Sequence, residues 1–362
     1  MISERNILIW LNSIGISSKK IEDLKEIYTD LCNLWHDNER SISKLNILND
    51  NMVYKINKYR NNKYLENLLL NLERNNINTI TVLDAEYPKD LLNITNKPMV
   101  LYTKGKYKDE DHFAISIVGS RKATAYGKWA CEKFTKELVE LGITIVSGLA
   151  MGIDTVAHKA TLENRGRTIG VLGNGIDYIY PKNNYQLYRD VAEKGCLMTE
   201  FPMGTKPINY NFPQRNRIIS GLSLGVIVIE AREKSGSLIT AHHALEQGKD
   251  VFALPGNINS IYSQGTNRLI RDGAKPLLCL DDILEEVYEL TQMKINKKQE
   301  YDYSSLSDDE IKIMKIISNG PIHADTIVLQ SEMDISNVMS ILTILELKGM
   351  IRELSGRIFC CC

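Results

Sequence analysis

The fold is decided by one stretch, residues 117–127, which reads IVGSRKATAYG. An apolar run ends there in glycine, serine and arginine, and a segment with helical periodicity follows. The apolar positions of that segment are Ala130, Phe134, Leu138 and Leu141. They share one helix face, so the helix can pack on a sheet while its N-terminus faces the strand end. A glycine, a hydroxyl and a guanidinium at a helix start suit phosphate, so the stretch predicts an anion-binding turn.

The same pattern recurs along the chain. Short apolar runs end in small or polar residues in ITIVSG (143–148), TIGVLG (168–173), GVIVIEA (225–231) and DVFALPG (250–256). Runs that are apolar on both faces and alternate with helical stretches are typical of buried parallel strands with crossover helices. We therefore expect an α/β protein with an extended, Rossmann-like, mostly parallel sheet. Its strand carboxyl ends would gather on one edge, where ligands bind in such sheets.

The usual nucleotide fingerprints are missing. The first turn has no G-x-G-x-x-G, and no G-x-x-x-x-G-K-[ST] occurs in the chain. Neither a standard dinucleotide enzyme nor a P-loop ATPase is therefore supported. The formal net charge of −1 provides no bulk attraction to nucleic acid, so binding would need a local basic groove.

Other sequence features indicate the cellular compartment and limit the possible metal and cofactor chemistry. The sequence shows no signal peptide and no transmembrane run, and its seven cysteines are mostly isolated, so we expect reduced thiols in a cytoplasmic protein. We interpret the run 360–362, CCC, as an exposed tail without a defined role. His242 and Glu246 have the spacing of a metal pair but no third ligand nearby, so we expect no metal and no cofactor.

The chain divides into five segments by composition and periodicity. They are a helical, SAM-like or helix-hairpin-helix-like domain (1–80), a connector (81–112), a Rossmann-like domain (113–290), a polar linker (291–304) and a winged-helix domain (305–362). At 362 residues the chain is long enough for more than one domain.

Two of these segments have open roles. The stretch 11–24, LNSIGISSKKIEDL, predicts two helices around a single glycine, where the DNA-binding form of such a hairpin prefers two. This favours a structural helix pair over a contact with the DNA backbone. In the C-terminal segment Ser307 and Glu310 have capping-box spacing before the first helix. The third helix begins ISNVMS, without lysine or arginine, which favours a protein contact or a structural role over duplex readout.

Five motifs, taken together, resemble a known family. They are GSRKAT, SGLAMGIDTVAH, EFPMGTKPINYNFPQRNRIISGLS, KSGSLITAHHALEQGKDVFALPGN and GTNRLIRDGA. They are similar to those of DNA-processing protein A, also called Smf, and the resemblance is contiguous over about 113–285. It implies a single-stranded DNA-binding protein, not an enzyme, that loads RecA-type recombinase during natural transformation. It also implies a homodimer that works on strands covered by single-strand binding protein.

The resemblance further implies a set of DNA-binding residues at the strand carboxyl ends. They are Gly119, Ser120, Arg121, Ser147, Gly148, Lys182, Phe212, Arg215, Asn216, Arg217, Lys234, Ser235 and Gly236. Arg121 would contact phosphate, Ser147 and Gly148 would add donors, and Phe212 would stack on a base. Two arginines at positions i and i+2 cannot share one target, so we expect Arg217 to be partly structural.

Alternative roles remain for several residues. The glycine-rich strand ends also resemble nucleoside-monophosphate-cleaving phosphoribohydrolases of the lysine-decarboxylase-like group, in which Glu200 or Glu230 could act as the acid. The characteristic P-G-G-x-G-T-x-x-E run is absent, which favours the binding protein. Arg121 could instead cap a helix or pair with Glu200. Asp154 and His158 lie four apart, and we expect a mutual ion pair or hydrogen bond rather than acid/base chemistry.

Overall fold

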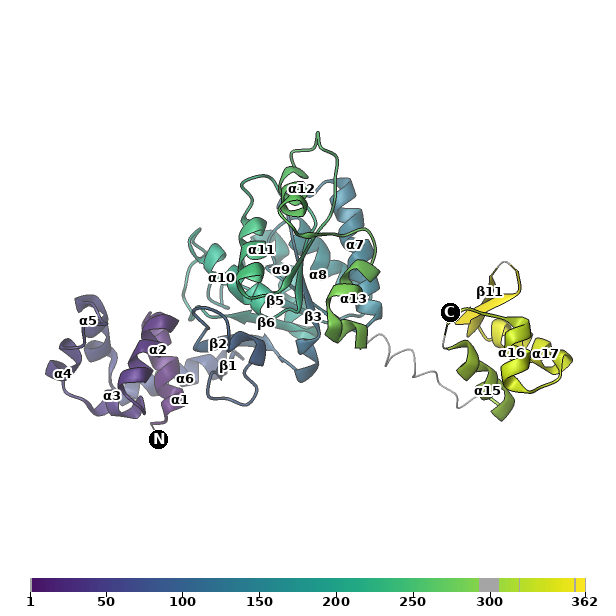
Figure 1. Ribbon diagram of the computed structural model, residues 1–362. Coiled ribbons are helices and arrows are strands. Elements are labelled where there is room, and N and C mark those ends of the chain that lie inside the picture. Colours follow the sequence, from purple (N-terminus) through teal and green to yellow (C-terminus); the bar gives the residue numbers. More distant parts are fainter. Residues whose placement is uncertain (1, 293–305, 319, 355, 362) are drawn as a thin grey trace. The chain divides into compact units, whose positions relative to one another are not determined.

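The computed structural model describes residues 2–292, 306–318, 320–354 and 356–361. These form two compact units, Met1–Glu289 and Leu290–Cys362, each of which is described by itself (Figure 1). Most of the expected linker 291–304 and residue 362 lie outside the described residues.

The first unit is built on a nine-stranded sheet with the order β1-β2-β6-β5-β4-β3-β7-β8-β9. Its strands are β1 (Asn78–Thr81), β2 (Val100–Gly105), β3 (Ala114–Val118), β4 (Thr144–Ser147), β5 (Thr168–Val171), β6 (Cys196–Thr199), β7 (Gly225–Val228), β8 (Asp250–Ala253) and β9 (Lys275–Pro276). In the order of the sheet, all neighbours from β6 through β5, β4, β3, β7 and β8 to β9 pair in parallel. Strand β2 pairs antiparallel with both β1 and β6. The expected Rossmann-like, mostly parallel sheet is confirmed, and the five predicted strands are β3, β4, β5, β7 and β8.

Helices connect the parallel strands, and a further helix follows β9. They are α7 (Ala125–Glu140), α8 (Ile153–Glu163), α9 (Tyr185–Lys194), α10 (Asn211–Gly221), α11 (Gly236–Glu246), α12 (Gln264–Arg271) and α13 (Asp281–Glu286), with the 3-10 helices η1 (Lys89–Leu91), η2 (Asp109–His112) and η3 (Lys182–Asn184). On α7 the predicted face is buried at Ala130, Phe134 and Leu138, while Leu141 forms the C-cap. Every residue of β3 and β4 is buried, as expected for strands that are covered on both faces.

The N-terminal part of this unit is helical. Its helices are α1 (Glu4–Ser13), α2 (Ser18–Ile27), α3 (Cys32–His36), α4 (Glu39–Ser43), α5 (Asp50–Tyr59) and α6 (Asn62–Arg74). Gly15 has a φ of +83° in the turn between α1 and α2, as the helix-turn-helix interpretation requires. These helices share a core with the sheet, and Tyr102 Oη of β2 donates to Asn12 Oδ1 of α1 at 2.8 Å. The expected boundary between residues 80 and 81 falls inside β1. The expected limits of the smaller domains within this unit stay predictions.

The second unit is a winged helix. It contains α15 (Asp308–Ile317), α16 (Ala324–Ser331), α17 (Ile335–Leu347), β10 (Ile322–His323), β11 (Ile351–Leu354) and β12 (Ile358–Cys361), with sheet order β10-β12-β11. The predicted capping box forms, because Ser307 Oγ accepts from the Glu310 amide and the Glu310 carboxylate accepts from the Ser307 amide. Cys360 and Cys361 belong to the central strand β12, opposite Arg352 and Ile351, so the expected tail is wrong for these two residues. Within the described ranges, no helix is both long and apolar enough to cross a membrane.

Candidate functional site

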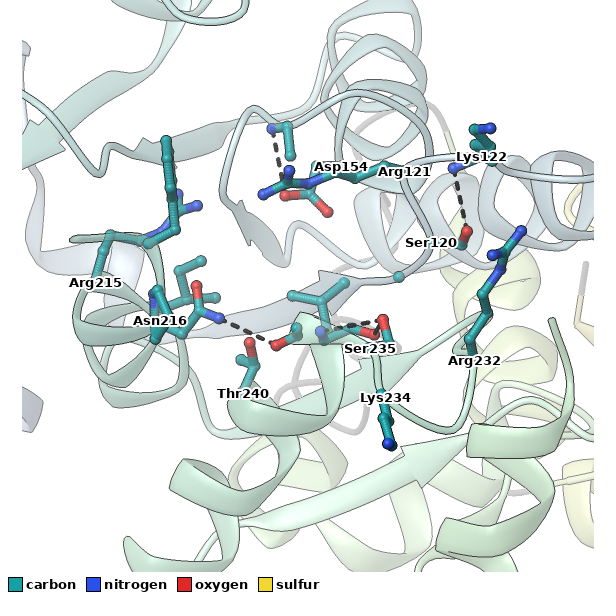
Figure 2. Close-up of a pocket in the computed structure, with 18 of the residues that line it drawn as sticks. Ser120, Arg121, Lys122, Asp154, Arg215, Asn216, Arg232, Lys234, Ser235 and Thr240 are labelled. Atoms are coloured by element: carbon teal, nitrogen blue, oxygen red, sulfur yellow. Dashed lines mark hydrogen bonds between the residues drawn. The ribbon is translucent and has the colours of Figure 1, made fainter. Parts of the chain in front are cut away.

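A cleft of about 490 Å³ opens at the carboxyl ends of β3, β4 and β7. Its walls come from the turn after β3, the start of α8, the first turns of α10 and the loop that leads into α11 (Figure 2). The charged residues that line it are Arg121, Lys122, Arg215, Arg232, Lys234 and Asp154. Five cations therefore face a single carboxylate, which makes the cleft a local basic site on a chain whose net charge is −1.

The structure brings most of the predicted residues together. Those that line the cleft are Gly119, Ser120, Arg121, Phe212, Arg215, Asn216, Lys234, Ser235 and Gly236. The other four, Ser147, Gly148, Lys182 and Arg217, do not line it. The gathering follows from topology, because the carboxyl ends of neighbouring parallel strands meet at one edge.

The turn after β3 is shaped by close backbone packing. A Cβ on Gly119 would lie 2.7 Å from Cγ1 of Ile153, and one on Gly152 would lie 2.2 Å from the carbonyl oxygen of Ser120. Ser120 Oγ accepts from the Lys122 amide at 3.1 Å (Figure 2). The glycines thus let α8 approach the turn, and Arg121 and Lys122 are left exposed.

The helix start that follows this turn is closed to anions. The Thr124 amide and Oγ1 donate to the carboxylate of Glu230 at 3.0 and 2.5 Å, and Glu230 is 3% exposed. A Cβ on Gly127 would lie 2.4 Å from Glu230 Cδ. The N-terminus of α7 is therefore satisfied by a carboxylate of this chain, which corrects the expectation that it faces phosphate. The N-terminus of α11, which begins at Gly236, is one of the helix starts that line the cleft.

An aromatic ring borders the cleft beside Arg121. The Arg121 guanidinium lies 5.8 Å from the centroid of the half-buried Phe212 ring, within the range of a cation–π contact. The Tyr180 ring lies 5.5 Å from Phe212, and a Cβ on Gly173 would meet Phe212 at 2.7 Å. Across the cleft, Asn216 Nδ2 donates to the Gly236 carbonyl at 3.3 Å and links α10 to α11 (Figure 2).

Arg215 forms the floor of the cleft. It is 4% exposed, and its Nη1 donates to the Gly148 carbonyl at 2.9 Å and to the Val171 carbonyl. Burial lowers the Arg215 pKa to about 10, an effect that Asp154 partly offsets, so the guanidinium stays charged at neutral pH. Burial raises the pKa of Asp154, which accepts from the Gly148 amide at 3.1 Å, while Arg215 opposes that rise. We therefore interpret Arg215 as a positive support that joins the ends of β4 and β5, not as the direct contact expected.

Arg217 is structural. Its Nη1 and Nη2 donate to the two Glu200 carboxylate oxygens at 2.6 and 2.7 Å, and Nη2 also donates to the Asn96 carbonyl at 2.7 Å. The pair fixes α10 against the segment after β6. Glu200 is thus taken by Arg217 and not by Arg121, so that alternative is wrong.

The remaining predicted residues lie outside the cleft lining. Ser147 is fully buried and its Oγ donates to the Ile117 carbonyl at 2.6 Å, and the Gly148 amide is taken by Asp154. Neither offers a free donor to the cleft, which corrects the expectation for both. Lys182 is exposed in η3, two positions after Tyr180, the partner of Phe212.

The sequence singled out two further pairs of titratable residues, Asp154 with His158 and His242 with Glu246. Asp154 and His158 do not pair, because His158 Nδ1 donates to Thr168 Oγ1 at 2.7 Å while Thr168 Oγ1 donates to the Ile145 carbonyl. Burial, assisted by Arg215, lowers the pKa of His158 to about 3, so the ring is neutral at physiological pH. His242 and Glu246 lie 3.4 Å apart on the surface of α11. Among the residues that the structure describes, no group of three or more His, Cys, Asp or Glu side chains could hold a metal ion.

Sequence reasoning missed two cations of the cleft. Lys122 adjoins Arg121, and Arg232 is the first cation after the strand run GVIVIEA, so both could have been found. Arg232 lies 4.8 Å from the Tyr262 ring centroid and donates to Tyr262 Oη at 3.1 Å. Tyr262 comes from the loop after β8, and no local pattern connects it to Arg232.

The fold and the site define a Rossmann-like protein that carries a basic cleft on its sheet and a separate winged helix. Residues 78–288 match the family described as DNA recombination-mediator protein A, and residues 298–357 match the DprA winged helix domain. Because the first match spans more than half of the chain, the chain belongs to the DNA recombination-mediator protein A family, also known as DprA or Smf.

Individual relatives agree with this assignment. The chain is 49% identical to the DNA processing protein DprA of Bacillus subtilis over 214 residues, which is 59% of this chain and 72% of that one. It is 45% identical to protein Smf of Escherichia coli over 226 residues, 62% of this chain and 60% of that one. The X-ray structure of DprA from Streptococcus pneumoniae superposes with a TM-score of 0.69 at 36% identity, covering 79% of this chain and 98% of that chain. A structure of the Helicobacter pylori protein, described for its single-stranded DNA binding mode, superposes with a TM-score of 0.53 at 31% identity, covering 59% and 96%.

Proposed function

We propose that this protein binds single-stranded DNA in the basic cleft and delivers it to a RecA-type recombinase in natural transformation. One observation carries the binding proposal: five cations against one buried carboxylate, with the Phe212 ring at the border. Family membership and the single-strand binding mode named for the Helicobacter pylori relative support it.

The cleft suits a single strand for physical reasons. Single strands are held by a cationic groove that follows the backbone and by aromatic faces on which bases stack. Arg121 and Lys122 are exposed for phosphate, and Phe212 is half-buried, so one part of its ring can receive a base. The cations meet phosphates rather than base edges, so binding is sequence-tolerant and salt-sensitive.

The winged helix does not have the chemistry of a duplex reader. Its third helix, α17, contains no lysine or arginine, so it lacks the cations that hold phosphates and the forks that read guanine. We assign single-strand binding to the sheet unit and leave protein contact as the role of the winged helix.

The proposal includes no catalytic step. The two carboxylates that a phosphoribohydrolase would use are engaged inside the protein, Glu230 by Thr124 and Glu200 by Arg217. Neither carboxylate lines the cleft. We also propose a homodimer in the cytoplasm that acts on strands covered by single-strand binding protein.

The test has two parts. Fluorescence anisotropy with a labelled thymidine oligonucleotide and with a duplex of equal length measures the preference, and tighter binding of the single strand is expected. Recombinase ATPase on single strands coated with single-strand binding protein measures delivery, and addition of this protein should shorten the lag. Equal affinity for the two DNAs would refute the binding proposal. Release of base from AMP at enzymatic rates would refute the absence of catalysis.

A further inference from the structure

Two aromatic side chains lie exposed on the first turns of α7. Tyr126 is 46% exposed and Trp129 is 57% exposed, and their rings stack with centroids 6.0 Å apart and an interplanar angle of 27°. The other two tryptophans, Trp10 and Trp35, are 0% and 8% exposed and pack edge to face in the N-terminal helices. An exposed and ordered aromatic pair is a surface that can receive another planar group.

Lysines continue the same helix face. Tyr126, Trp129, Lys133 and Lys136 follow one another at spacings of three, four and three, so they form one stripe along α7. The two lysine side chains are 37% and 60% exposed, and each lies 3.8 Å from a glutamate four positions on. Ion pairs of this kind on a surface are weak, so both ammonium groups can still serve an incoming anion.

The stripe begins where the cleft ends. Lys122 lines the cleft in the turn before α7 and precedes Tyr126 by four residues in the sequence. Tyr126 Oη donates to the Pro255 carbonyl at 3.1 Å, in the loop whose Tyr262 packs on the cleft residue Arg232. The aromatic pair therefore adjoins the cleft along the chain that follows Lys122 and through the hydrogen bond between Tyr126 and Pro255.

Resting on the proposed function, we propose that Tyr126 and Trp129 form a second stacking platform for bases of the same single strand after it passes Lys122. Every base has a π-face, so such a platform binds without regard to sequence. The stacked rings match the bases of a single strand, while Lys133 and Lys136 share the hollow beside Trp129 with Glu132 and Glu163.

Tryptophan fluorescence can detect DNA binding at the proposed platform. Trp10 and Trp35 are buried, so quenching by DNA reports on Trp129. Thymidine oligonucleotides of about 4 and about 16 nucleotides bracket the site sizes of single-strand grooves. We expect both to bind, but only the longer one to quench emission and to gain affinity from the platform. An abasic strand of the longer length should bind without quenching.

Three variants sharpen the test. Trp129→Ala should weaken binding of the longer oligonucleotide about tenfold and leave the shorter one unchanged. Trp129→Phe keeps a ring and should restore most of that affinity. The matched control is Tyr54→Ala on α5, which removes a 60% exposed ring that lies 5.3 Å from the ammonium of Lys58 and should change neither affinity.

The outcomes separate the two proposals. If both oligonucleotides bind but Trp129 emission stays constant, or Trp129→Ala binds the longer strand as wild type does, the platform is refuted while the cleft stands. If Trp129→Ala instead changes the sedimenting mass of the free protein, the stripe is a protein interface and the platform is refuted. If neither oligonucleotide binds, the cleft proposal fails, and the platform fails with it.

Discussion

Replacing Arg121 by alanine is the sharpest test of the cleft. Arg121 is exposed in the turn after β3, and its guanidinium lies 5.8 Å from the Phe212 ring centroid. It is not held by Glu200, whose two carboxylate oxygens accept from Arg217. The charge is therefore available to a phosphate, and its removal should leave the fold intact because no core contact is lost.

The size of the effect follows from that exposure. A hydrogen bond to a charged group contributes about 1.5–3 kcal/mol, so Arg121→Ala should weaken single-strand binding by about tenfold to a hundredfold. One lost phosphate contact should also reduce the slope of log affinity against log salt by about 0.7 for a single strand. Arg121→Lys should recover only part of the affinity, because an ammonium cannot reproduce the planar fork of a guanidinium.

The assay is a salt titration of oligonucleotide affinity, with thermal melting to check folding. The control is Arg165→Asn, which removes an exposed guanidinium from the loop before β5, at the opposite edge of the sheet. Asparagine accepts the positive φ of 58° at that position. If folded Arg121→Ala keeps the affinity and the salt slope of wild type, the DNA path does not pass this turn.

Three further predictions concern stability and the division of labour. His158 has a pKa of about 3 in the fold against 6.5 ordinarily, so between these values the unfolded chain binds up to one more proton than the folded chain. The free energy of unfolding therefore rises by about 1.4 kcal/mol for each unit that the pH increases in this range. Urea denaturation at pH 4 and 6 should show that His158→Asn lacks this rise of about 1.4 kcal/mol per unit, and an equal pH dependence in both proteins would contradict it. Arg217→Ala should lower the free energy of unfolding by about 3 kcal/mol, because it leaves the Glu200 carboxylate, which is 11% exposed, without its partner. The salt titration of oligonucleotide affinity should give the same slope for Arg217→Ala as for wild type. A chain shortened to residues 1–289 should keep most of the affinity for single-stranded DNA. A chain of residues 113–290 loses β2 and the core shared with the N-terminal helices, so it should not fold, as measured by circular dichroism. Wild-type affinity in 306–361 alone would assign binding to the winged helix.

Local sequence determined the parallel sheet and the place of the cleft. Runs such as ITIVSG are apolar on both faces and alternate with helical stretches, which is typical of buried parallel strands, and the carboxyl ends of such strands gather at one edge. The Ser307 and Glu310 capping box and the turn at Gly15 could be predicted for the same reason, since each depends on residues a few positions apart. β6 was missed, because its apolar run CLM (196–198) is only three residues long and no glycine turn marks its end.

Only the tertiary structure decided what each charged side chain does. Arg215 and Arg217 look alike in the sequence, but one is enclosed beneath the cleft against two carbonyls and the other is bound to Glu200 outside it. The carboxylate of Glu230, which lies far from α7 in the sequence, accepts a hydrogen bond from the Thr124 amide at the N-terminus of α7. Strand and helix periodicity reflect a preference repeated over neighbouring residues, whereas the state of a charge depends on the single partner and the burial that the folded chain supplies. The sequence by itself therefore determined where a ligand can bind, and the packing of distant segments determined which cations are left exposed to hold it.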